Sequence, residues 1–146
     1  MINRYINSEI DSIWNDQNKF NTWKLVQEKY LETLEELNIA DKGVAKKIKE
    51  TEVLKEEVYK REEVTNHDLA SFVDILQEKV GEGSNWIHYG LTSSDIVDTA
   101  NSILIMQSII FFNDKMFHPS FYTLSPVIGV CLIIWFAQKD EIITKI

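Results

Sequence analysis

The first proline of this chain is Pro119, so most of the sequence contains none. Because proline removes a backbone donor and clashes with the preceding helical turn, its absence permits long, uninterrupted helices. Apolar side chains in this region recur at intervals of three or four residues, the spacing that places them on one helix face. Such stripes occupy residues 6–14, 23–37, 69–80 and 96–104. With no alternation typical of strands and no internal repeat, the predicted fold class is all-α.

Thr92 and Asp95 stand three residues apart, which is the spacing of a helix capping box. Together with the apolar stripe that follows, they predict a helix that begins at Thr92 or Ser93. The first N–H groups of a helix lack intrahelical partners and carry the positive end of its dipole. His88 and Gly90 come just before, and Gly90 permits a tight turn next to a ligand. The pattern predicts a site for a carboxylate or phosphate, although an ordinary capped helix beside a buried histidine explains the same residues.

A second segment repeats this arrangement, because Thr65 and Asp68 have the same spacing ahead of the stripe at residues 69–80. It predicts another capped helix start, with His67 in the first helical turn. The N-terminus of a helix disfavours a cationic side chain, so His67 is expected to be neutral. Two helix starts that each carry a histidine can converge on one pocket.

The chain carries 15 basic and 23 acidic side chains, for a formal net charge of -8. Because no basic patch is present, the composition argues against nucleic-acid binding. The densest charge lies in residues 51–63, where Val53, Leu54 and Val58 are the few aliphatic anchors. This stretch is predicted to be a solvated helix face, and we expect neither a metal ion nor a cofactor.

The tail after Ser108 differs in composition, since residues 116–138 contain no Asp, Glu, Lys or Arg. Two prolines interrupt this stretch, and its strictly apolar part, residues 127–137, is too short to cross a bilayer comfortably. A buried helix or strand is therefore favoured over a membrane anchor, and the clustered apolar surface favours self-association. The single cysteine, Cys131, excludes an intrachain disulfide and fits a reducing, cytoplasmic location.

Two motifs resemble adenylosuccinate lyase, a branch of the fumarase and aspartase superfamily. They are Val-Thr-Asn-His-Asp-Leu-Ala-Ser-Phe at residues 64–72 and Trp-Ile-His-Tyr-Gly-Leu-Thr-Ser-Ser-Asp-Ile-Val-Asp-Thr at residues 86–99. Arg4-Tyr5, Ile13-Trp14 and Asn18-Lys19-Phe20 agree with the same family. The resemblance runs from Met1 to about Gln107. It predicts a lyase amino-terminal helical domain at residues 1–108, followed at 109–146 by an apolar tail that does not match the family.

The resemblance implies elimination of fumarate from adenylosuccinate and from the succinylated carboxamide ribotide of purine biosynthesis, by a cytoplasmic homotetramer that needs no cofactor. His67 and His88 then support the site. The substrate-binding residues implied are Arg4, Tyr5, Asn66, His67, Asp68, Thr92 and Ser93. A sister lyase, such as argininosuccinate lyase, and a non-catalytic helical oligomerisation module remain as alternatives.

The acid and base of this family lie further along its chain. One is a histidine in a Thr-His-Gly motif, and the other is a serine in a loop with a Met-Pro-x-Lys-x-Asn-Pro pattern. Neither motif occurs in this sequence, where His118 is followed by Pro119. We therefore expect a truncated or divergent central helical region and a chain that is inactive alone.

Overall fold

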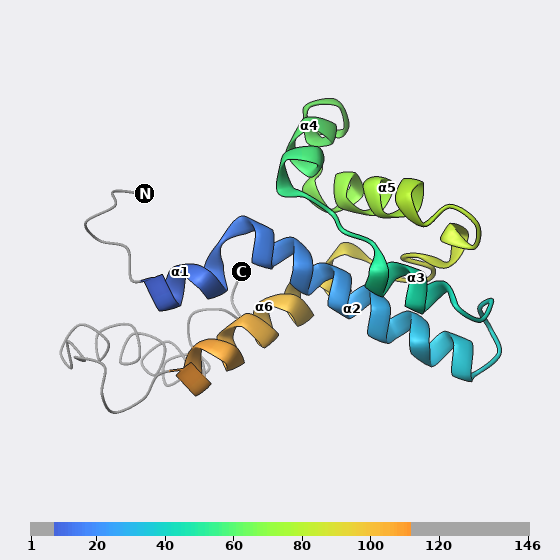
Figure 1. Cartoon of the computed structure of the whole chain (residues 1–146), viewed down its shortest axis with the longest axis horizontal. Helices are drawn as coiled ribbons and strands as arrows, with labels where there is room; N and C mark the ends of the chain where they lie inside the picture. The colour runs from blue at the N-terminus through green and yellow to red at the C-terminus, as the bar shows by residue number, and fades with distance from the viewer. Residues whose placement is uncertain (1–7, 112–146) are drawn as a thin grey trace, which may run out of the picture. The chain divides into compact units, whose positions relative to one another are not determined.

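A computed structural model of the chain describes residues 8–111, which belong to one compact unit that ends at Phe111. Within this range every regular element is helical, which confirms the all-α prediction (Figure 1). The elements are α1 (Ser8–Trp14), α2 (Asp16–Glu36), α3 (Val44–Glu50), α4 (Lys55–Thr65), α5 (Asp68–Val80), the 3-10 helix η2 (Ser84–Trp86) and α6 (Ser93–Phe111). The predictions made for Arg4, Tyr5 and the tail from residue 112 onward lie outside the described residues.

Helix α2 is the longest of these elements and packs against both α3 and α6 (Figure 1). Its N-cap is Asn15, whose side chain accepts a hydrogen bond of 2.9 Å from the Asn18 backbone N–H, as N-cap residues commonly do. Helices α4 and α5 pack against each other, and α1 contacts the far part of α6. The Trp14 indole N–H fixes that last contact by donating to Ser108 Oγ at 2.9 Å.

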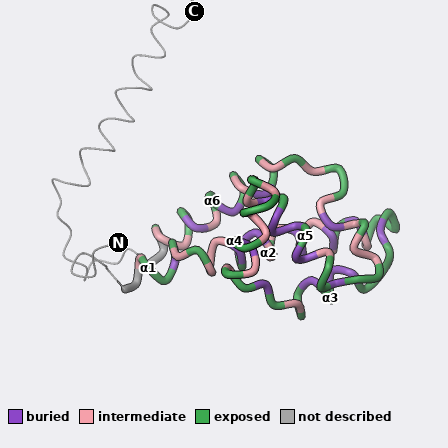
Figure 2. Tube along the Cα trace, turned by 90° about the horizontal axis from the view of Figure 1, so that it is seen from above, coloured by how far each residue is buried: buried purple, intermediate pink, exposed green. Residues whose placement is uncertain are grey.

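The core is centred on three aromatic rings from α2 and α5. Phe20, Trp23 and Phe72 are each at most 1% exposed, and their ring centroids lie 5.3 to 6.0 Å apart. Along α2, α3, α5 and α6, buried positions alternate with half-buried and exposed ones (Figure 2). On α6 these positions are Ile96, Ala100 and Leu104, which the sequence stripe had placed on one side. The apolar stripes of α5 and α6 therefore point inward, as the periodicity predicted, whereas Trp14 and Leu37 at the ends of the first two stripes are exposed.

The charged stretch at residues 51–63 is predicted to form one solvated helix face, but only part of it is helical. Residues 51–54 are not helical, and α4 begins only at Lys55. Val53 and Val58 are buried, but Leu54 is 43% exposed because it occupies the N-cap position, where its backbone N–H donates to Glu57 Oε2. The remainder of α4 is largely solvated, as expected.

Candidate functional site

Three of the predicted site residues line one cavity of about 210 Å³. His67 comes from the start of α5, His88 from the loop after η2, and Ser93 from the start of α6. The rest of the lining belongs to α5, namely Leu69, Ala70, Val73 and Asp74. The two histidine-bearing helix starts thus meet at one place, although about twenty residues of chain separate them.

His67 is the N-cap of α5 rather than a residue of its first turn. The capping box predicted at Thr65 is wrong, because Thr65 is still the last residue of α4. Its hydroxyl instead accepts a hydrogen bond of 3.3 Å from the His67 backbone N–H. Nδ1 of His67 takes the capping role by accepting a bond of 3.3 Å from the Ala70 backbone N–H.

Asn66, Asp68 and Thr92 are not among the residues that line the cavity, but each is next in sequence to one that is. Asn66 ends α4 in the left-handed conformation, with a φ of 53°. Asp68 begins α5, and its Oδ1 lies 3.7 Å from His67 Nδ1. Thr92 directly precedes α6, and its backbone N–H donates to Asp95 Oδ2 at 2.8 Å. That bond is one half of the capping box predicted at this helix start.

His88 is held by Gln27, a residue of α2 that sequence reasoning missed. Gln27 Oε1 accepts a bond of 3.1 Å from the His88 backbone N–H, and Gln27 Nε2 lies 3.0 Å from His88 Nδ1. Burial of the imidazole lowers the pKa of His88, against a smaller opposing effect of the Asp95 charge. One signal was available, because Gln27 is a polar residue four positions after Trp23 on the buried side of the helix.

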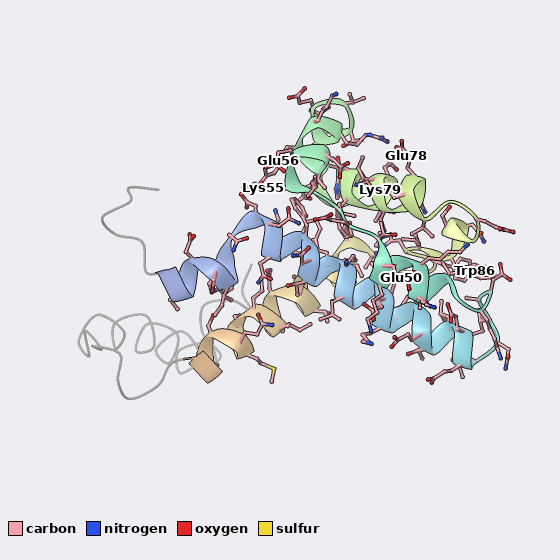
Figure 3. All side chains as sticks on the ribbon, viewed as in Figure 1. Glu50, Lys55, Glu56, Glu78, Lys79 and Trp86 are labelled. Atoms are coloured by element: carbon pink, nitrogen blue, oxygen red, sulfur yellow. The ribbon has the colours of Figure 1, made fainter. Side chains whose placement is uncertain are left out.

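Other contacts fix the loop that carries His88. The Tyr30 hydroxyl donates to the Tyr89 carbonyl at 2.9 Å, and the Trp86 indole N–H donates to Asp41 Oδ2 at 3.0 Å. Trp86 lies at the end of the unit where the connection between α2 and α3 passes (Figure 3). Gly90 has a φ of 72°, a conformation that side chains other than glycine rarely adopt, so its role in the turn agrees with the sequence.

The cavity has a mixed electrostatic character. No Lys or Arg is among the described residues that line it, whereas Asp74 is. Arg61 offsets part of that negative charge, because its Nη1 lies 3.5 Å from Asp74 Oδ2. For an anion, the described residues offer the Ser93 hydroxyl, the imidazoles and the first N–H groups of α6. No group of three His, Cys, Asp or Glu side chains in residues 8–111 could hold a metal ion.

A second hollow of about 370 Å³ lies between α4 and α5 and contains none of the predicted site residues. Four of its five charged side chains form two pairs, as Lys79 Nζ approaches Glu57 Oε2 and Arg61 Nη2 approaches Glu78 Oε2, each at 2.6 Å. Lys79 and Glu78 extend from α5 in this region (Figure 3). The hydrogen bond from Lys79 lowers the pKa of Glu57. These two pairs account for the charged side chains of the hollow other than Lys60 without a ligand.

Comparison with known proteins finds adenylosuccinate lyases among the relatives of this chain. The adenylosuccinate lyase of Thermotoga maritima is 38% identical over a match that covers 74% of this chain and 25% of that enzyme. The chain is homologous to the amino-terminal portion of adenylosuccinate lyase. The adenylosuccinate lyase of Aquifex aeolicus agrees, at 40% identity over 75% of this chain and 26% of its own length. The chain thus spans about a quarter of the length of these adenylosuccinate lyases, and no protein-family model matches it.

Among the described residues, no helix has the length and apolar character needed to cross a membrane. This holds for α6 too, although α6 is the most apolar of the long helices. The apolar stretch at residues 127–137 lies outside the described part of the chain.

Proposed function

We propose that residues 1–108 form the substrate-binding part of an adenylosuccinate lyase active site. The observation that carries this proposal is the cavity shared by His67, His88 and Ser93, within sequence about 40% identical to such enzymes. The ligand would be an anionic nucleotide substrate. Its succinyl carboxylate would meet Ser93, Thr92 and the N-terminus of α6, where unpaired N–H groups stabilise negative charge.

The remaining family residues would complete the pocket. Arg4 would contact the phosphate, since a guanidinium is permanently charged and binds phosphate oxygens in pairs, and Tyr5 would lie beside it. Asn66 and Asp68, the sequence neighbours of His67, would bind polar groups of the substrate. These roles follow from the resemblance.

The reaction needs two proton transfers. A base removes a proton from the carbon beside a carboxylate, the carbon–nitrogen bond breaks, and an acid protonates the leaving nitrogen. Fumarate and AMP result from adenylosuccinate, and the succinylated carboxamide ribotide reacts in the same way. The base and the acid would come from family segments that this sequence does not contain, so residues 1–108 would bind and orient the substrate. The active enzyme would be a cytoplasmic homotetramer without a resident cofactor.

Adenylosuccinate is expected to bind weakly at this cavity, because only part of the pocket is present. In an NMR titration, backbone signals near Ser93 and His67 should shift first. Ser93→Ala should weaken binding by about tenfold, the loss expected for a hydrogen bond to a charged group. Ser102→Ala is the matched control, because Ser102 lies on the same helix and its hydroxyl donates to Asp98 O. Shifts confined to residues 51–63 would contradict the proposal.

A non-catalytic helical association module is the second candidate function, and the outer face of α6 favours it. Ile105, Met106 and Ile109 are 49%, 63% and 65% exposed, which leaves adjacent apolar side chains in water. Burying such a patch between copies is favourable. Light scattering is therefore expected to give a mass above the 17.0 kDa of one chain. Replacing Met106 and Ile109 by Ser should reduce that mass, and a concentration-independent monomer of the unaltered chain would count against association.

A further inference from the structure

Both polar atoms of the Gln27 side-chain amide contact His88. Gln27 is 1% exposed and lies four positions from the buried Trp23 on one side and from the buried Leu31 on the other. Both its oxygen and its nitrogen lie within hydrogen-bond distance of His88, at 3.1 Å from the backbone nitrogen and 3.0 Å from Nδ1 of the ring. A buried glutamine with both ends on one residue constrains that residue in backbone and in side chain.

The chemistry of an amide then decides which ring nitrogen carries the proton. The His88 backbone N–H can only donate, so the amide group facing it must be the oxygen. The amide nitrogen, which can only donate, therefore faces Nδ1. Nδ1 must accept and carries no proton, and a neutral ring then has its proton on Nε2.

We propose that Gln27 is a positioning residue that holds His88 as the Nε2–H tautomer at the edge of the cavity, so that the ring donates a hydrogen bond to an anionic oxygen of the substrate. The assignment of the tautomer stands on the contacts of Gln27 alone. The use of the donor for substrate rests on the proposed lyase function.

The backbone of His88 supports this role. Its φ of 63° lies in the left-handed region, which is uncommon for residues other than glycine and is retained where surrounding contacts impose it. The bond from the His88 N–H to Gln27 Oε1 is such a contact. The titratable groups around the ring are Asp95, which acts on it through its charge, and His67 and Asp74, which line the same cavity. Of these groups, only Gln27 contacts Nδ1 of the ring, so Gln27 sets the tautomer, and the carboxylates of Asp95 and Asp74 act on the ring through their charge or from across the cavity.

The direct test uses the unaltered 146-residue chain labelled with ¹⁵N in its histidines. At a pH above the titration of His88, long-range ¹H–¹⁵N spectra distinguish a protonated ring nitrogen from an unprotonated one. We expect Nδ1 of His88 to be unprotonated and Nε2 to carry the proton. A proton on Nδ1, or an even mixture of the two tautomers, would overturn the proposal without any variant having to fold.

Two substitutions then test whether Gln27 is the cause. In Gln27→Glu, the introduced carboxylate can still accept from the His88 N–H. Because it has no proton to donate, it can contact Nδ1 only as an acceptor. The proton should move to Nδ1, and the pKa of His88 should rise because a negative charge now faces the ring. Gln27→Met keeps the volume but forms neither bond, so both tautomers should become populated. An unchanged Nε2–H tautomer in both variants would show that Gln27 does not determine it.

Gln17→Glu is the matched control, because Gln17 lies on the same helix and is also held at both ends of its amide. Its nitrogen donates to Val53 O at 2.8 Å, and its oxygen accepts from the Lys55 N–H at 3.0 Å. This control adds the same charge to α2 without changing a partner of His88. It should leave the tautomer as in the unaltered chain.

Substrate binding separates this proposal from the lyase function. If the His88 donor contacts substrate, Gln27→Glu should weaken adenylosuccinate binding about tenfold more than Gln17→Glu, as expected for one hydrogen bond to a charged group. The comparison is made at a pH above the titration of His88 in both variants, because only a neutral ring with its proton on Nδ1 loses the Nε2 donor. Absence of binding to the unaltered chain, with the tautomer as assigned, would reject the lyase function alone. Equal binding by the two variants would reject the contact between His88 and substrate.

Discussion

The 146-residue chain is expected to release fumarate from adenylosuccinate far more slowly than a complete lyase. The loss of one acid or base slows such a reaction by about two to four orders of magnitude, and the motifs that carry both are missing here. His67 and His88 can bind and orient the substrate but do not replace the pair. Fumarate release, followed by its absorbance and by chromatography of AMP, measures the rate, with the Thermotoga maritima enzyme as the positive control.

Turnover within tenfold of that control would contradict this expectation. It would mean that groups within this chain supply both proton transfers, and the two cavity histidines would be the first to examine. The pH dependence would then be informative, because burial lowers the pKa of His88. A rate that depends on neutral His88 would persist as the pH falls below 6.5 and be lost only near the lowered pKa.

Truncation of the central aromatic ring is expected to have the largest effect on stability. Phe72 is fully buried, stacked on Phe20 at 6.0 Å and set edge-on to Trp23 at 5.6 Å. Phe72→Ala removes this packing and leaves a cavity, which costs about 3–5 kcal/mol. Because small domains are stable by only about 5–15 kcal/mol, the variant should melt far below the unaltered chain or fail to fold. Thermal and urea unfolding, monitored by circular dichroism, measure the change.

Val64→Ala is the control for side-chain truncation in this experiment. Val64 lies on α4 and is 79% exposed, so its removal should change the free energy of unfolding by less than about 0.5 kcal/mol. A loss below about 1 kcal/mol in Phe72→Ala would show that the aromatic cluster does not hold α5 against α2. The α5 part of the cavity depends on that packing, since Ala70 and Val73 lie on the same helix.

The sequence determined the features that depend on local chemistry and periodicity. The stripe on α6 predicted that Ile96, Ala100 and Leu104 would be buried together, and they are. Asp95 reaches back to the Thr92 N–H because the residue three positions into a helix can approach the N-cap. These relations involve residues a few positions apart, so they can be found without knowledge of tertiary packing.

The same local reasoning was wrong where an adjacent element competed for the residues. Thr65 has the spacing of an N-cap, but α4 extends through it and moves the cap of α5 to His67. Leu37 continues the apolar stripe of α2 yet is 63% exposed, because the helix ends one residue earlier. The position of a helix end depends on the chain on both sides of it, which a spacing rule does not include.

Tertiary structure alone decided how the cavity is assembled. The amide of Gln27 contacts a histidine 61 positions away, and Asp74 joins the lining because α5 lies beside the loop that carries His88. Neither contact leaves a pattern in the neighbouring sequence, since both depend on how α2 and α5 pack around the aromatic core. Residue types and their spacing indicated which side chains could bind an anion. Packing decided which of them share a cavity, and through Gln27 it decided which nitrogen of His88 carries the proton.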